Sequence, residues 1–251
     1  MKTLRATEII FSFETIEALC PHCNNWSIYN RASDLKTLQK ISGLDVTCFN
    51  DQCKKTFRIL GDLINPSWQM LIRDCSFLKQ RKKYSYCILN VCQAYEMYFS
   101  FYLRTIFLYK PFETKSLNEI MLFNRASQLL YDTTKEWTYS TLRNTVIQQM
   151  VKNTIYLQSE VENEIKKIKN TSRTIPTDES IKNISNKQLS DMLIELKSIN
   201  IGSLRNHVVH KNGYCPTIEE VEEAEEKAGI LYRLDNYFGL LSYKYHAFEL
   251  H

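Results

Sequence analysis

Residues 204–228 read LRNHVVHKNGYCPTIEEVEEAEEKA, and this stretch predicts a helix, a turn and a second helix. Leu204 and Val208 are four residues apart, so a helix would place both side chains on one face, which we expect to be buried. A lysine, an asparagine and a glycine follow and indicate a turn. Thr217, with Glu220 three residues later, has the spacing of a capping box, which starts a helix. The stretch therefore favours a helical fold.

The composition of the whole chain extends this prediction. Of 251 residues, 44% are hydrophobic and only 6 are Gly and 5 are Pro, which excludes a disordered chain and disfavours a sandwich or barrel over most of it. Apolar residues recur at helical spacing after residue 66. We expect one long helix or two abutting helices over 67–109, a polar loop over 171–185, and further helices over 117–132, 140–170, 186–199, from 203 and from 217.

The N-terminal part of the chain has a different pattern. Short runs over 8–13, 26–29 and 56–60 combine β-branched and aromatic residues, which predicts a few small strands. The pattern becomes helical near residue 66. We therefore expect two domains, a β module over 1–66 and a helical domain over 67–251, and the predicted fold class is mainly α.

Neither a targeting signal nor a membrane span is expected. The N-terminal apolar residues are interrupted by Glu8 and Glu14, so they do not form a secretory signal. The most apolar segment, 84–109, contains Glu96 and Arg104, which are costly at bilayer depth. We therefore expect a cytoplasmic protein without membrane contact, where cysteines serve as metal ligands more often than as disulfides.

Four cysteines have the spacing of a metal site. Cys20 and Cys23 form one short knuckle, and Cys48 and Cys53 form a second, so both pairs of thiolates can point at one ion. Four thiolates favour Zn²⁺ over other metals and leave no open coordination position. The segment over about 15–60 resembles a zinc ribbon, and the expected cofactor is a structural zinc ion. His22 lies inside the first knuckle and is expected to be a bystander.

The net charge of +4 is unevenly distributed along the chain. Residues 67–216 contain 21 Lys and Arg against 13 Asp and Glu, whereas residues 217–251 contain 3 against 8. A basic central region can attract phosphate backbones, although a solvated lysine-rich surface has the same composition.

The chemistry-bearing residues of the opening stretch are Arg205, Asn206 and His210. Asn206 and His210 are four residues apart and lie away from the face of Leu204 and Val208. A histidine can move a proton near pH 7, and a guanidinium can clamp a phosphate through two hydrogen bonds. This set suits cleavage of RNA, whereas the simpler interpretation is a capped surface helix with incidental polar residues.

The Arg-Asn-x-x-x-His pattern, followed by a turn and a capped acidic helix, resembles the HEPN superfamily of helical ribonucleases and RNA-associated domains. The resemblance covers about residues 67–245 and is most specific over 205–228. It implies an all-α bundle, a homodimer and metal-independent endoribonuclease activity that leaves a cyclic phosphate. It assigns catalytic roles to Arg205, Asn206 and His210, and it adds Glu96 as an acidic residue facing the Arg/His pair. It also implies a toxin or phage-defence role, with RNA as substrate and an antitoxin or defence-system protein as partner.

Two features depart from the HEPN pattern: the loop over 170–186 is longer than a minimal helical bundle needs, and one position differs from some HEPN toxins. Those toxins carry a tyrosine two residues after the histidine, where this chain has Asn212, and its nearest tyrosine is Tyr214. In those toxins the tyrosine is the target of nucleotidyl transfer by a partner enzyme, and the sequence does not predict this form of control here. The alternatives to an endoribonuclease are a non-catalytic module that binds RNA or protein, and a structural adaptor.

Overall fold

The computed structural model describes residues 9–11, 15–36, 43–59, 67–112 and 117–240. The described chain is mainly helical, with a small β region near the N-terminus, as predicted. It divides into two compact units, Met1–Lys83 (unit 1) and Tyr84–His251 (unit 2). The division lies after Lys83, so the first helix is grouped with the β region. The predicted boundary at residue 66 remains a prediction.

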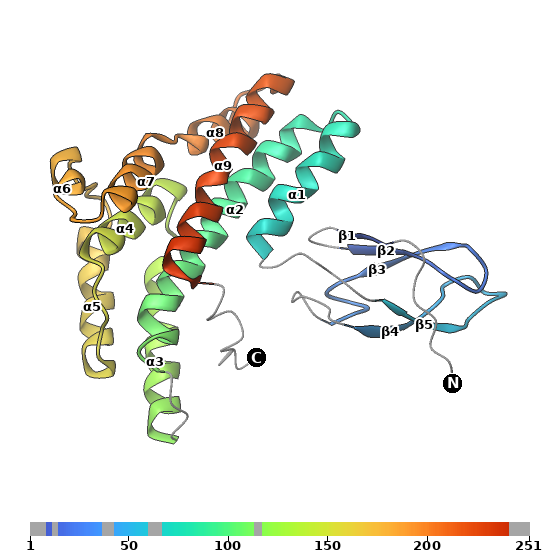
Figure 1. Cartoon of the computed structure of the whole chain (residues 1–251), viewed down its shortest axis with the longest axis horizontal. Helices are drawn as coiled ribbons and strands as arrows, with labels where there is room; N and C mark the ends of the chain where they lie inside the picture. Colours follow the sequence, from blue (N-terminus) through green and yellow to red (C-terminus); the bar gives the residue numbers. More distant parts are fainter. Residues whose placement is uncertain (1–8, 12–14, 37–42, 60–66, 113–116, 241–251) are drawn as a thin grey trace. The chain divides into compact units, whose positions relative to one another are not determined.

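Unit 1 contains two small antiparallel sheets (Figure 1). Strands β1 (Ile9–Phe11), β2 (Thr15–Leu19) and β3 (Trp26–Asn30) form the first sheet in the order β1-β2-β3. Strands β4 (Leu44–Thr47) and β5 (Thr56–Ile59) form the second. The sequence predicted strands at the positions of β1, β3 and β5 but missed β2 and β4, which pair with them.

The core of unit 1 follows the alternation of the strands. In β2 and β3 every second side chain is buried, and the intervening ones are partly or fully exposed. The inward set includes Ile16, Tyr29 and Phe57, which pack with two of the knuckle cysteines. Helix α1 (Ser67–Gln80) also belongs to this unit, and it ends before Lys82, whose φ of 56° is left-handed. The helical spacing over 67–109 is therefore broken, and the alternative of two helices is the one observed.

Helix α2 (Tyr84–Arg104) is the centre of unit 2. It packs against α4 (Tyr139–Lys152), α8 (Ile201–His210) and α9 (Ile218–Phe238), and Figure 1 shows α9 running along it. Its buried side chains include the aromatic residues Tyr95, Tyr98 and Phe99. The helix continues into a π-helical segment, η1 (Thr105–Tyr109), in which the amide of Lys110 donates to the carbonyl of Thr105 at 2.9 Å.

The remaining helices complete unit 2. Helix α3 (Leu117–Thr134) packs against α5 (Gln158–Thr171), and α6 (Asp178–Lys182) packs against α7 (Lys187–Ser198). The predicted continuous helix over 140–170 is wrong, because α4 ends where Asn153 adopts a left-handed conformation with φ 43°. The predicted loop over 171–185 contains the short helix α6, which buries Ile181.

The two helices of the opening stretch form as expected. Thr217 caps α9, since its hydroxyl accepts from the amide of Glu220 at 3.3 Å and its own amide donates to the Glu220 carboxylate at 2.8 Å. This reciprocal pair is the predicted capping box. Across the described residues, none of the helices combines the length and apolar character needed to cross a membrane.

Candidate functional site

The two cysteine knuckles are built alike. In the first, the amide of Asn24 donates to the carbonyl of Cys20 at 2.9 Å, and in the second the amide of Lys54 donates to the carbonyl of Asn50 at 3.0 Å. Asn24 and Lys54, each following the second cysteine of its knuckle, are left-handed with φ of 55° and 48°. This reversal turns both cysteines of each pair towards one point.

The four predicted cysteines, Cys20, Cys23, Cys48 and Cys53, gather as expected. Their sulfur atoms all lie within 4.8 Å of one another. The Sγ atoms of Cys20 and Cys53 are 3.9 Å apart, and those of Cys23 and Cys48 are 3.7 Å apart. A tetrahedral ion with metal–sulfur bonds of about 2.3 Å needs sulfur–sulfur separations of about 3.8 Å. The cluster therefore has the size of a four-thiolate metal site.

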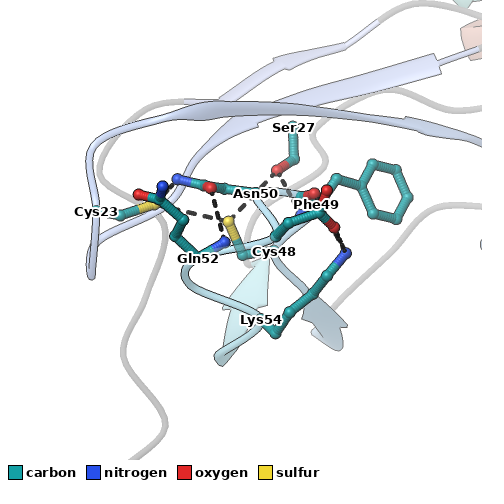
Figure 2. Close-up of polar contacts among 8 residues, drawn as sticks. Cys23, Ser27, Cys48, Phe49, Asn50, Gln52 and Lys54 are labelled. Atoms are coloured by element: carbon teal, nitrogen blue, oxygen red, sulfur yellow. Dashed lines mark hydrogen bonds and ion pairs between the residues drawn. The ribbon is translucent and has the colours of Figure 1, made fainter.

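Polar groups surround the sulfur atoms. The hydroxyl of Ser27 donates to Cys48 Sγ at 3.8 Å, and the amide of the Asn50 side chain donates to Cys23 Sγ at 3.7 Å (Figure 2). The backbone amide of Asn25 lowers the pKa of Cys23 to about 7, whereas burial raises the pKa of Cys20 to about 12. The donors favour thiolate ligands, and a bound cation would displace the remaining protons.

His22 lies outside the sulfur cluster. Its Nε2 atom is 3.2 Å from the carbonyl oxygen of Thr56, the first residue of β5. A ring N–H donated to that carbonyl accounts for the position of the imidazole. The expectation that His22 is a bystander agrees with this contact.

The second candidate site lies on α8 in unit 2. Asn206 and His210 are exposed, and Arg205 is half-buried, with its Nη1 atom donating to Asn206 Oδ1 at 3.2 Å. Leu204 and Val208 are half-buried and not fully buried as predicted, since α8 is a short helix whose buried residue is Ile201. The predicted separation still holds, because the exposed polar pair lies on the side away from this face.

Packing of α8 against α2 brings Arg205 near Glu96. Glu96 is half-buried, and burial raises the pKa of its carboxyl above the ordinary value, while the positive charge of Arg205 lowers it in part. The thiol of Cys92, one turn earlier on α2, donates to Glu96 Oε1 at 3.9 Å. Burial, followed by the nearby Glu96 charge, raises the pKa of Cys92 to about 12. A cation and an acidic group from two helices therefore share one environment.

A third group of contacts closes the turn between α8 and α9. The ring of Tyr214 lies 5.5 Å from the ring of His207, and its hydroxyl donates to Glu220 Oε1 at 2.7 Å. Burial, together with this bond, raises the pKa of Tyr214 to about 12. His207 therefore belongs to the turn and not to the group of Arg205 and Glu96.

Sequence reasoning did not single out two side chains of α4, Tyr139 and Arg143. Burial raises the pKa of Tyr139, and the nearby charge of Arg143 lowers it in part. The Tyr139 ring packs against Tyr95, which precedes Glu96 on α2. Arg143 is four residues later on the same helix and lies over the Tyr139 ring. The spacing of the two residues was visible in the sequence, but the helices that they contact were not.

Comparison with known proteins adds no relative. The sequence matches no protein-family model and no curated protein, and the structure matches no solved structure.

Proposed function

We propose that unit 2 is a metal-independent endoribonuclease of the HEPN kind, with its centre on α8. The observation that supports this proposal is that α8 packs against α2, so that the charge of Arg205 acts on the Glu96 carboxyl while Asn206 and His210 are exposed on the same helix. Asn206 and His210 are exposed and Arg205 is half-buried, so a phosphate could approach these side chains from solvent. The Arg-Asn-x-x-x-His pattern shared with the HEPN superfamily supports the same proposal.

The proposed reaction is attack of a ribose 2′-oxygen on the adjacent phosphorus. The O2′–P bond forms, the P–O5′ bond breaks, and the products are a 2′,3′-cyclic phosphate and a 5′-hydroxyl. His210 accepts the proton of the 2′-hydroxyl or donates a proton to the leaving 5′-oxygen, and Arg205 balances the charge that grows on the non-bridging oxygens. Asn206 orients the guanidinium through the hydrogen bond to its Oδ1 atom. Glu96 holds Arg205 electrostatically.

We also propose that the protein acts as a homodimer. One chain supplies a single His210, whereas the proposed reaction removes one proton and delivers another. A two-fold dimer formed through unit 2 would bring two copies of the motif to one cleft, so each phosphate could be held from both sides. The HEPN resemblance implies the same assembly.

The cysteine cluster of unit 1 is proposed to bind one structural Zn²⁺ ion. Four thiolates leave no position for water or substrate, so the ion would stabilise the module and take no part in cleavage. The HEPN resemblance further supports a role as a toxin or phage-defence effector that is regulated by a partner protein.

Cleavage of a labelled RNA by the His210→Ala variant tests the catalytic proposal. We expect a loss of about 100- to 10,000-fold in rate, because one general acid–base group is removed. Arg205→Lys should also lose activity, since an ammonium group cannot make the two-pronged phosphate contact. EDTA added to the folded protein should leave the rate unchanged.

His207→Ala is the matched control, because it removes an exposed histidine of the same helix that contacts Tyr214. This variant should retain most of the activity. Full activity of His210→Ala, or equal cleavage of an RNA with 2′-deoxy positions, would contradict the proposal. Binding of RNA without cleavage by the wild-type protein would favour the non-catalytic alternative.

A further inference from the structure

Two side chains of α4 form hydrogen bonds to the junction between α7 and α8. The Nη1 atom of Arg143 donates to the carbonyl oxygen of Ile199 at 2.6 Å, and the hydroxyl of Tyr139 donates to the same oxygen at 3.5 Å. The guanidinium carbon of Arg143 lies 5.7 Å from the centroid of the Tyr139 ring. Ile199 is the C-terminal cap residue of α7, so its carbonyl needs a donor from outside that helix. A charged donor makes this a strong contact.

The beginning of α8 rests directly on the Tyr139 ring. A Cβ atom built at Gly202 would lie 3.0 Å from Cδ1 of Tyr139, closer than side chains normally approach. A side chain at this position would therefore require the buried Tyr139 ring or α8 to shift by a few tenths of an ångström. Arg205 lies only three residues later on the same helix.

The Tyr139 ring also packs against two aromatic residues of α2. Its centroid lies 5.8 Å from that of Tyr95, with the rings nearly perpendicular, and 5.9 Å from that of Phe99. Tyr139 is 5% exposed, so the ring has little freedom to move. The ring therefore contacts both α2, which carries Glu96, and α8, which carries Arg205.

We propose that Tyr139 and Arg143 are positioning residues that fix the start of α8 against α2 and so hold Arg205 on the side of α2 that carries Glu96. They act through the α7–α8 junction and Gly202 and make no contact with substrate. The effect on cleavage rests on the proposed function, whereas the influence of Arg205 on the pKa of Glu96 can be measured without any activity.

The variant Gly202→Ala tests this placement, with Gly229→Ala as the matched control. Both add one methyl group inside a helix, but a Cβ atom at Gly229 would meet nothing within 4 Å. The measurement is the pKa of the Glu96 carboxyl, followed by NMR titration of the ¹³C-labelled protein. Displacement of α8 should move the positive charge of Arg205 away from Glu96 and so raise the Glu96 pKa. The pKa of Glu96 in an Arg205→Met variant shows how large this rise can be. Gly229→Ala should leave the Glu96 pKa unchanged.

Substitutions of Arg143 provide a second test, in case Gly202→Ala fails to fold. Arg143→Met removes the donor to Ile199, so the Glu96 pKa should rise, whereas Arg143→Lys keeps a cationic donor and should restore it. Arg125→Met is the control, because Arg125 ties α3 to Glu162 of α5 at 2.9 Å. An unchanged Glu96 pKa in both Gly202→Ala and Arg143→Met would overturn the proposal.

Kinetics then separate the positioning role from the proposed function. In Gly202→Ala we expect kcat for RNA cleavage to fall about 10- to 100-fold with little change in KM, because a small misplacement of a catalytic group is costly. A shifted Glu96 pKa with an unchanged kcat would also overturn the positioning role. A wild-type protein that does not cleave RNA would instead refute the proposed function, and the pKa comparison would still test the placement of α8.

Discussion

Glu96 experiences two opposing influences on one carboxyl group. Burial in α2 favours the neutral acid, and the positive charge of Arg205 favours the carboxylate. Burial is the larger of the two, so the pKa of Glu96 lies above its ordinary value in the folded protein. The unfolded chain then loses this proton at lower pH than the folded chain does. Neutral Glu96 therefore stabilises the folded protein at low pH. This contribution to the free energy of unfolding is lost as pH rises through the pKa of Glu96 in the folded state.

Glu96→Gln should remove this pH dependence. We expect the free energy of unfolding of the variant, relative to wild type, to be higher at pH 8 than at pH 4.5, because glutamine stays neutral throughout. Urea unfolding at the two pH values measures the difference. Glu222→Gln, on the exposed side of α9, is the control and should show the same relative stability at both. If the difference in free energy of unfolding between Glu96→Gln and wild type were the same at both pH values, Glu96 would not be a buried group that ionises in this range.

At the scale of the helices, the start of α9 is stabilised by its capping box and by a tyrosine of the preceding turn. The capping box joins Thr217 to Glu220, and the Tyr214 hydroxyl donates to the same carboxylate. Backbone and side-chain donors lower the pKa of Glu220, and the nearby charge of His207 lowers it further. The carboxylate thereby links the end of α8 to the beginning of α9.

Thr217→Ala should destabilise the protein by about 1 kcal/mol, the usual cost of losing an N-terminal cap. The alanine leaves the amide of Glu220 without its side-chain acceptor. Urea unfolding followed by circular dichroism measures the loss. Thr174→Ala, at an exposed threonine outside the helices, should leave the midpoint unchanged. Equal midpoints for the Thr217 variant and wild type would show that the cap does not stabilise α9.

Spacing in the sequence predicted most of the helices and the α9 cap, because periodicity and capping are local properties. It failed between α4 and α5, where apolar spacing continues across Asn153 although the backbone turns left-handed there. The gathering of the four cysteines was also predictable from their paired spacing. The contacts of Tyr139 and Arg143 were not, because Ile199 lies 60 and 56 residues away from them in the sequence.

At the scale of the molecule, the two units carry different chemistry. Unit 1 holds the sulfur cluster, and unit 2 holds the polar residues of α8 and α2. The proposed cleavage therefore uses groups from unit 2 alone. Zinc binding and catalysis can be tested separately.

We expect about one Zn²⁺ ion per chain, lost in the Cys48→Ser variant, because a closed tetrahedral site needs all four thiolates. Elemental analysis of the purified protein measures the metal. Cys215→Ser is the control, since Cys215 is exposed and lies outside the cluster. Unchanged zinc content after substitution of Cys48 would rule out the four-cysteine site.

The whole protein should form a homodimer at micromolar concentration, as the shared phosphate site requires. Light scattering gives the molar mass, compared with 29.6 kDa for one chain. RNA cleavage measured at the same concentrations links assembly to activity. A monomer with full activity would refute a site built from two chains.

The π-helical segment η1 accommodates one more residue than an α-helical turn of the same rise, as its bond from Lys110 to Thr105 indicates. Removing one residue within η1 would convert the turn to α-helix and preserve the packing faces on either side. The same deletion in the middle of α2 would rotate every later side chain by about 100° and bury the wrong face. In an alignment of homologous chains, a single-residue gap in this region is therefore expected at residues 105–109 and not within α2.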